Sequence, residues 1–262
     1  MSLLYSVVTV CKNSESTISK TIESVLVQTY SKLELIIIDG MSTDDTPSIV
    51  HSYKDERIIY VREIDFGIYY AMNRGIGMAR GDVVSILNSD DFYLPQAIDS
   101  VNYQFHIDKD LAILCSDVYC INLDKSLNIM AADIKNLKTA MVPHPGVFMK
   151  RNIKDVQLNF REDLRIAADY DLLLRNYVNG VKMKRLATPI AFYSKGGFSD
   201  SPPNRIISLV ETFKIQRTYI TNQTFKQMTN FIWNTLGTLI LRDGKLEMFS
   251  SLLNYLREWK KR

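Results

Sequence analysis

Apolar residues in the first hundred positions follow two alternating patterns. Continuous apolar runs, which are typical of strands buried on both faces, lie at Tyr5–Val10, Leu33–Ile38, Ile58–Val61 and Asp82–Leu87. Between these runs, apolar residues recur at helical spacing in Ser14–Gln28 and Phe66–Ala79, and Ser42–Pro47 supplies turn and helix-start residues. The alternation predicts an α/β domain with a Rossmann-like, mostly parallel central sheet flanked by helices on both faces.

The pattern is looser after Pro95. It predicts further helices and short strands up to about residue 200 and mainly helices beyond, with no internal repeat and no sharp domain boundary. The expected elements are a helix over Gln96–His106, strands within Leu111–Cys120, a polar stretch to Lys138, an apolar segment opened by Pro143–Gly146, a helix over Asp163–Asn176, strands within Val181–Phe192 and helices from Pro202.

Composition narrows the class of protein. A chain of 262 residues with 46% hydrophobic positions can bury a large core, and its interleaved 32 basic and 29 acidic residues indicate no nucleic-acid partner. The three cysteines Cys11, Cys115 and Cys120 lack zinc-site spacing and leave one unpaired in any disulfide scheme, which favours the reducing cytoplasm. No export signal is visible, and no run approaches the roughly 20 apolar residues that span a bilayer, so any membrane contact is expected to be peripheral.

Polar clusters follow the predicted strands, at the point where each strand ends. They are Cys11–Asn13, Asp39–Asp45, Glu63–Gly67 and Asn88–Asp91. Ligands of open α/β sheets bind outside the carboxyl ends of the strands, so the sequence predicts one binding rim there.

Two of these clusters contain carboxylates with alternative roles. Asp90 and Asp91 could hold Mg²⁺ or Mn²⁺ together with substrate phosphate oxygens, or could cap a helix and complement its dipole. Asp39 could form a turn with Gly40 or accept hydrogen bonds from a bound ligand.

Candidate acid–base residues lie in the second half of the chain. Asp169 and Asp171 are two positions apart at a helix start, so only one of them can face a given site. A carboxylate on such a rigid element could deprotonate a substrate hydroxyl, although capping or surface roles are also open. His144 lies between two prolines and could bind a metal, contact an acceptor substrate or serve in a loop. Because it has no ligand-spaced neighbours, the loop role is favoured.

Taken together, residues 4–200 resemble the family 2 glycosyltransferases, which are inverting enzymes with the GT-A fold. The resemblance is carried by Ser6–Val10 with Asn13, by Thr17–Tyr30 and by Leu35–Asp44. The runs Glu63–Gly75, Ala79–Asp82 and Leu87–Asp91 are similar to a subgroup found in bacterial O-antigen and capsule biosynthesis.

This resemblance implies roles for particular residues. It assigns nucleotide-sugar binding to Thr9, Asp39, Asp65, Asn73 and Asn88, metal binding to Asp90 and Asp91, and catalysis to Asp169 as the base. Asn88 departs from the family by replacing the first Asp of the Asp-x-Asp motif, and Ala168 replaces the Glu of the usual Glu-Asp pair. The implied reaction moves a sugar from a nucleotide-diphosphate sugar, above all a UDP-sugar, to a hydroxyl of a glycan, with Mn²⁺ or Mg²⁺ as cofactor. The implied acceptor is a polyprenyl-diphosphate-linked O-antigen or capsular repeat unit.

The resemblance also suggests how the chain is divided. A GT-A catalytic domain is expected over residues 1–200, with a nucleotide-binding half at about 1–95 and an acceptor-binding half at about 96–200, followed by a helical C-terminal extension over 201–262. Apolar faces in the extension could pack on the catalytic domain, form a homodimer, or bind the inner face of the cytoplasmic membrane through Trp259 and Lys260–Arg262.

Two other classes of protein compete with this interpretation. A sugar nucleotidyltransferase usually carries a Gly-rich phosphate loop after its first strand, and Cys11–Ser19 contains none. A non-catalytic nucleotide- or sugar-binding module of the same fold is disfavoured by the joint presence of Asp39, Asp90 and Asp169. Product formation from a nucleotide sugar would decide between them.

Overall fold

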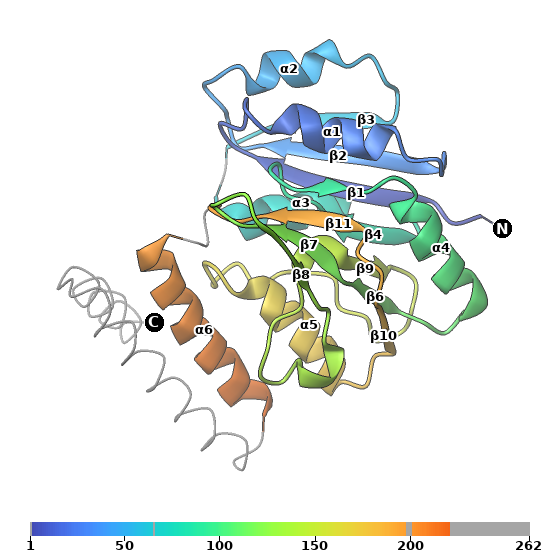
Figure 1. The fold of residues 1–262 in the computed structure, drawn as a ribbon, viewed down its shortest axis with the longest axis vertical. Coiled ribbons are helices and arrows are strands. Elements are labelled where there is room, and N and C mark those ends of the chain that lie inside the picture. Colours follow the sequence, from blue (N-terminus) through green and yellow to red (C-terminus); the bar gives the residue numbers. More distant parts are fainter. Residues whose placement is uncertain (1, 65, 198–200, 221–262) are drawn as a thin grey trace.

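The computed structural model describes residues 2–64, 66–197 and 201–220 (Figure 1). The strands are β1 (Tyr5–Cys11), β2 (Leu33–Asp39), β3 (Ile58–Arg62), β4 (Val83–Ile86), β5 (Phe92–Tyr93), β6 (Ile113–Ser116), β7 (Val118–Ile121), β8 (Leu127–Met130), β9 (Val147–Lys150), β10 (Met183–Leu186) and β11 (Ala191–Ser194). The helices are α1 (Ile18–Leu26), α2 (Thr46–Ser52), α3 (Ile68–Met78), α4 (Ala97–Ile107), α5 (Ala168–Val178) and α6 (Pro202–Tyr219), with short 3₁₀ helices η1 (Ile134–Asn136) and η2 (His144–Gly146).

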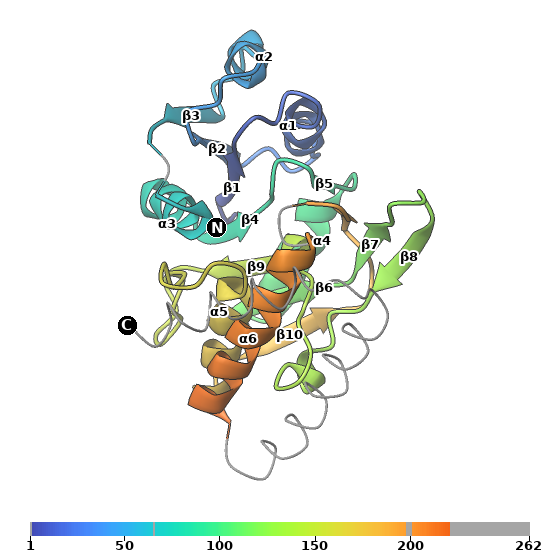
Figure 2. The same cartoon turned by 90° about the vertical axis from the view of Figure 1, so that its left-hand side faces the viewer.

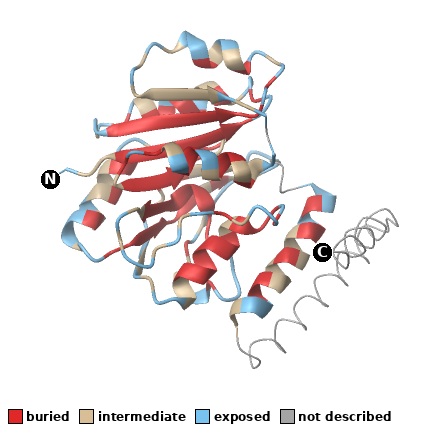
Figure 3. Cartoon of the chain, turned by 180° about the vertical axis from the view of Figure 1, so that it is seen from behind, coloured by how far each residue is buried: buried red, intermediate tan, exposed pale blue. Residues whose placement is uncertain are grey.

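The main sheet confirms the predicted α/β fold. Within the described residues it has seven strands in the order β10-β6-β9-β4-β1-β2-β3, and only β9 runs antiparallel to its neighbours β4 and β6. Strand β1 is central and buried along its whole length, because both of its faces are covered (Figure 3). Full burial on both faces explains why the sequence shows a continuous apolar run there.

Two apolar cores lie on opposite faces of this sheet. Val8 and Val10 of β1 point into a core shared with α3 and α5, whereas Val7 points into a core shared with α1 and α4. Figure 2 shows α1 and α3 on opposite sides of the first strands. Each fully buried aliphatic side chain stabilises the fold by about 1.5–3 kcal/mol, so the two cores hold the strand ends rigidly in place.

A second, smaller sheet was not predicted from the sequence. It has the order β5-β11-β7-β8 and lies beside the end of β4. Strand β8 lies in the stretch for which the sequence indicated only polar character. Its apolar residues Leu127 and Ile129 are exposed, so the strand shows no alternation of buried and exposed positions that would have predicted it. This sheet brings β11 next to the Asn88–Asp91 turn.

Several predicted helices begin later than expected, and the first of them, α1, starts at Ile18 rather than Ser14. Helix α3 starts at Ile68 because Gly67 has φ +124°, a conformation that a helix cannot contain. Helix α5 starts at Ala168 rather than Asp163, since the preceding N–H groups of residues 165–167 donate to a carboxylate on α6 instead of forming a helical turn.

Helix α6 lies alongside α5 in both ribbon views (Figures 1 and 2). It confirms the helix predicted from Pro202, over residues 202–219. Trp259 and Lys260–Arg262 lie outside the described residues. None of the helices within the described ranges is long and apolar enough to cross a membrane.

Candidate functional site

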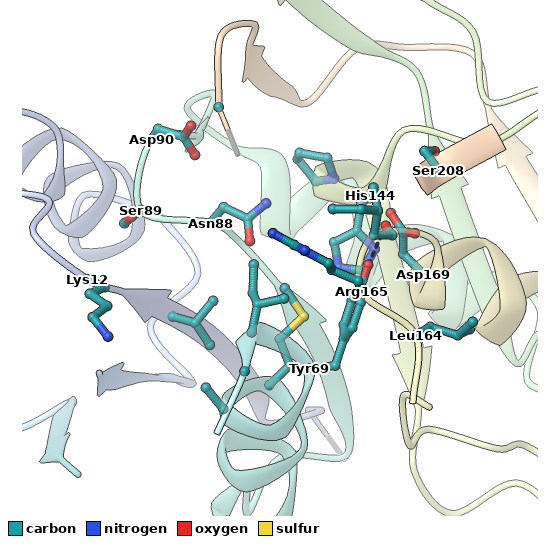
Figure 4. Close-up of a pocket in the computed structure, with 18 of the residues that line it drawn as sticks. Lys12, Tyr69, Asn88, Ser89, Asp90, His144, Leu164, Arg165, Asp169 and Ser208 are labelled. Atoms are coloured by element: carbon teal, nitrogen blue, oxygen red, sulfur yellow. Dashed lines mark hydrogen bonds between the residues drawn. The ribbon is translucent and has the colours of Figure 1, made fainter. Parts of the chain in front are cut away.

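A cavity of about 1880 Å³ lies where the first strands of the main sheet end (Figure 4). Cys11 and Gly40 line it from the ends of β1 and β2, and Asn88 from the end of β4. The opposite wall contains His144 of η2 and Asp169 of α5. The cavity is therefore the rim that the sequence predicted, joined to a second wall from the later part of the chain.

The turn after β4 presents an amide and a carboxylate to the cavity. Asn88, Ser89 and Asp90 line it, and the buried Oδ1 of Asn88 has no hydrogen-bond partner among the described residues. Burial raises the pKa of Asp90, and within the described chain no cationic side chain pairs with this carboxylate. A half-buried carboxylate without a counter-charge is stabilised in its ionised form by a nearby cation.

Asp91 points away from the same turn. Its side chain is buried and accepts a hydrogen bond from the N–H of Ser194 on β11 at 2.9 Å, and it does not line the cavity. Burial, reinforced by the charge of Asp90, raises the pKa of Asp91 well above its usual range. Direct metal binding by Asp91 stays a prediction.

Asp39 and Thr9 lie just behind the cavity wall. The Asp39 carboxylate is fully buried and accepts hydrogen bonds from the Ser42 N–H at 2.8 Å, the Ser42 hydroxyl at 2.6 Å and the Tyr60 hydroxyl at 2.6 Å. Thr9 is equally buried, and its Oγ1 has no partner among the described residues. Neither residue lines the cavity, so Asp39 here organises the loop after β2, and its contact with a nucleoside stays a prediction.

Asn73 connects two segments that are distant in the sequence. Its amide nitrogen donates to the Phe160 carbonyl at 2.9 Å and to the Glu162 carboxylate at 2.8 Å, and its amide oxygen accepts from the Phe160 N–H at 2.7 Å. These bonds fasten the segment that leads into α5, and Asn73 does not line the cavity. Asp65, the remaining predicted donor-binding residue, lies outside the described residues.

Asp169 faces the cavity from the first turn of α5. Burial raises the pKa of Asp169 to about 7, and the charge of Glu211 acts in the same direction. Its Oδ1 accepts a hydrogen bond from the Tyr170 N–H at 2.8 Å. Figure 4 shows Asp169 on the wall opposite Asp90, next to His144. A carboxyl with this pKa can exchange a proton near neutral pH.

Asp171 points the other way, as its two-residue spacing from Asp169 predicted. It is fully buried, with ion pairs of 3.3 Å to Arg175 and 3.4 Å to Arg161. The Tyr219 hydroxyl donates to it at 3.3 Å. Asp171 therefore fastens α5 rather than serving the cavity.

The substitution Asp171→Ala is expected to lower the free energy of unfolding by about 3–5 kcal/mol, because it leaves the buried Arg175 guanidinium without its counter-charge. Urea denaturation measures this change. Asp163→Ala is the matched control, because Asp163 also pairs with Arg161 but its side chain is 49% exposed, so its effect is expected to stay within about 1 kcal/mol. Equal losses for the two variants would contradict the structural role of Asp171.

The structure places in the cavity wall several residues for which the sequence favoured no binding role. His144 was expected in a loop, and its ring lies in the cavity wall on η2. Burial lowers the pKa of His144 to about 4, and neither ring nitrogen has a partner among the described residues, so it is a neutral hydrogen-bonding group at pH 7. Figure 4 shows the Arg165 side chain reaching across the cavity toward Asn88. Tyr69 lines the cavity too, and its hydroxyl donates to the Ile166 carbonyl.

Comparisons with known proteins identify the family of this chain. Residues 6–158 match the family described as Glycosyl transferase family 2. Over 98 residues the chain is 38% identical to the UDP-Glc:alpha-D-GlcNAc-diphosphoundecaprenol beta-1,3-glucosyltransferase WfaP of Escherichia coli, covering 37% of this chain and 39% of that protein. Four curated relatives are matched over only 25% to 62% of their own lengths.

Solved structures with the same fold cover nearly the whole chain. S. aureus TarS 1-349 in complex with UDP-GlcNAc superposes with a TM-score of 0.74 at 18% identity, over 96% of this chain and 79% of that one. The mannosyltransferase PcManGT from Pyrobaculum calidifontis in complex with GDP-Man and Mn²⁺ gives 0.68 at 18% identity, over 98% and 80%. At this level of identity the likeness concerns the fold, and it confirms the predicted GT-A architecture.

Proposed function

The chain belongs to glycosyl transferase family 2, as its sequence predicted, and on that premise we propose that it transfers a sugar from a nucleotide-diphosphate sugar to a hydroxyl group of a glycan with inversion. One observation carries this proposal: Asp90 and Asp169 lie on opposite walls of one cavity. Its volume of about 1880 Å³ exceeds the roughly 300–1,000 Å³ typical of a pocket for one small ligand, which leaves room for donor and acceptor together.

The proposed chemistry is a direct displacement at the anomeric carbon. Asp169 accepts the proton of the acceptor hydroxyl while that oxygen forms its bond to the anomeric carbon. The bond from this carbon to the donor phosphate oxygen breaks, and the nucleoside diphosphate leaves. A carboxylate with a pKa of about 7 suits the role of base, because general bases work best when their pKa lies near the operating pH.

Donor binding is proposed at the ends of β1, β2 and β4. Lys12, Asn13 and Gly40 line this part of the cavity, together with the unpartnered Oδ1 of Asn88. Direct contacts from Thr9, Asp39, Asp65 and Asn73 remain part of the proposal. In the described structure Asp39 orders the adjacent loop, and Asn73 fastens the segment before α5.

Mn²⁺ or Mg²⁺ is the proposed cofactor, with Asp90 as its protein ligand and Asn88 beside it. No group of three or more His, Cys, Asp and Glu side chains among the described residues could hold a metal ion. One carboxylate and one amide oxygen still fit these cations, which usually bind one or two protein oxygens and take further ligands from substrate phosphates and water. When bound, the cation would neutralise charge on the departing diphosphate. Ligation by Asp91 is also part of the proposal, with its side chain behind the residues that line the cavity.

The acceptor and the cellular setting are also proposals. The E. coli relative is named for a UDP-glucose donor and a diphosphoundecaprenol-linked acceptor, which supports a UDP-sugar and a lipid-linked glycan intermediate here. Such an acceptor would place the enzyme in the cytoplasm at the inner face of the membrane, with residues 201–262 packing on the catalytic domain, forming a homodimer or making a peripheral membrane contact. The catalytic domain would then correspond to residues 1–200.

A ligand screen tests the donor part of this proposal. We expect one of UDP, GDP, dTDP or CMP, or a sugar derivative of these, to raise the melting temperature in the presence of Mn²⁺ but not with EDTA. A ligand at 100 times its Kd stabilises the native state by about 2.7 kcal/mol. Release of the nucleoside diphosphate from the matching donor then separates an enzyme from a binding module. Folded protein that responds to no nucleotide and releases none would contradict the proposed function.

A further inference from the structure

A buried carboxylate on α6 binds the segment that leads into α5. Glu211 is 1% exposed, and it accepts hydrogen bonds from three consecutive backbone N–H groups. These come from Arg165 at 2.7 Å, Ile166 at 2.9 Å and Ala167 at 3.0 Å. Hydrogen bonds to an ionised acceptor are about twice as strong as neutral ones, so this contact fixes the backbone of residues 165–167.

Glu211 holds the backbone that leads directly into helix α5. The helix's own N-cap residue, Ala167, offers no side-chain oxygen to the free N–H groups of the first turn. Glu211, which is more than 40 residues away in the sequence, accepts hydrogen bonds from the N–H groups just before that turn. Its negative charge complements the positive end of the helix dipole. The position of Asp169, two residues after Ala167, therefore depends on α6.

Other contacts hold the same region from two sides. From α3, the Tyr69 hydroxyl donates to the Ile166 carbonyl. From α6, the Gln216 side chain donates to the Tyr170 hydroxyl at 2.9 Å, and Tyr219 donates to Asp171. Glu211 accepts hydrogen bonds from the N–H groups of this segment, and Tyr69 donates one to a carbonyl of the same segment. The backbone before Asp169 therefore has little freedom to rotate.

We propose that Glu211 is a positioning residue for the transfer reaction: it holds residues 165–167 so that Asp169 faces the acceptor. This inference rests on the proposed function of Asp169. It gives α6, which lies beyond the residues matched to the family, a direct part in the catalytic geometry.

Within the described chain, two ionisable side chains act on Asp169 directly, Tyr69 from α3 and Glu211 from α6. Figure 4 shows His144 next to Asp169. The cationic side chains that line the same cavity include Arg165, Arg205 and Lys214. Burial is the main cause of the raised pKa of Asp169, and Glu211 adds to it. Burial also keeps His144 neutral at pH 7 and Tyr69 protonated. Loss of the Glu211 charge should therefore lower the pKa of Asp169 and make it a weaker base.

The test compares Glu211→Gln and Glu211→Asp with Arg217→Gln, a control on the exposed side of the same helix. Steady-state kinetics across pH 5 to 9 give kcat, the KM values and the acidic limb of kcat/KM. For Glu211→Gln we expect at least a tenfold lower kcat, a donor KM within twofold of wild type, and an acidic limb moved to lower pH. Glu211→Asp keeps the negative charge but has a shorter side chain. We therefore expect its acidic limb of kcat/KM to stay near the wild-type pH and its kcat to fall.

A second readout does not require turnover. The difference in unfolding free energy between each protein and its Asp169→Asn derivative, followed against pH, reports the pKa of Asp169. Should Glu211→Gln fail to fold, Glu211→Asp and its double variant still test the reach of the side chain. Unchanged kcat and an unchanged acidic limb in Glu211→Gln would overturn the inference. A wild-type protein that transfers no sugar would instead overturn the proposed function, and the stability titration would still reveal the influence of Glu211 on Asp169.

Discussion

Asp169→Asn is expected to reduce turnover by about 10²- to 10⁴-fold, the range that a positioned general base contributes. Asparagine has the same shape as aspartate but cannot take up the acceptor proton. Asp169 lies on the α5 wall, away from Lys12 and Gly40 at the donor end of the cavity. We therefore expect the affinity for the nucleotide donor to stay within about twofold of wild type, so that the loss falls on kcat.

Release of nucleoside diphosphate in the presence of acceptor measures the turnover, and calorimetry measures donor binding. Asp155→Asn is a suitable control, because Asp155 is exposed, lies outside the cavity and has a φ of +69° that asparagine also tolerates. Near-normal turnover in Asp169→Asn, with the control unchanged, would remove Asp169 from the role of base.

The same substitution has a pH signature. Because burial raises the pKa of Asp169 to about 7, kcat/KM should fall about tenfold per pH unit below that value, as the base becomes protonated. The protonated side chain favours the folded state. This contribution is fully present below the unfolded pKa of about 3.9 and is lost as pH rises through about 7. Asp169→Asn should therefore gain stability relative to wild type between about pH 4 and pH 8, and a constant difference over that range would contradict a raised pKa.

The first half of the fold could be predicted from the sequence because its strands are buried on both faces. Strands β1 to β4 lie within a residue or two of the apolar runs that predicted them. The second sheet could not be predicted, because β5 has two residues and β8 is mostly exposed, so neither leaves a periodic signal. The insertion of β9 between β4 and β6 depends on long-range pairing that local patterns do not contain.

The sequence indicated where some of the candidate residues lie, whereas their roles stay predictions. Asn88 and Asp90 lie on the cavity as expected, and the helical spacing of Asp169 and Asp171 correctly indicated that only one faces it. Glu211 carries no sequence signal, because an acidic residue in a helix is usually solvated. Its burial becomes favourable only when the N–H groups of residues 165–167, distant in the sequence, are brought to it.

Asp90→Ala is expected to abolish the Mn²⁺-dependent part of donor stabilisation and to lower turnover by roughly 10²-fold or more, since a metal ion contributes several kcal/mol of charge stabilisation. Without metal, the variant should be at least as stable as wild type at pH 7. Burial raises the pKa of Asp90, so its ionised form opposes folding as pH rises, and alanine removes that opposition.

The effect of Asp90→Ala on stability with and without the cation distinguishes a metal ligand from a helix cap. A capping aspartate stabilises the protein in EDTA and its loss costs about 1 kcal/mol, whereas a ligand for a cation stabilises it only when the cation is present. Melting temperatures with EDTA, with Mn²⁺, and with Mn²⁺ plus the nucleotide separate the two roles. Asp91→Asn is the matched variant, because asparagine can still accept from the Ser194 N–H. Loss of the Mn²⁺ response in Asp91→Asn as well would make Asp91 a second ligand, whereas an unchanged response in Asp90→Ala would refute the proposed metal site.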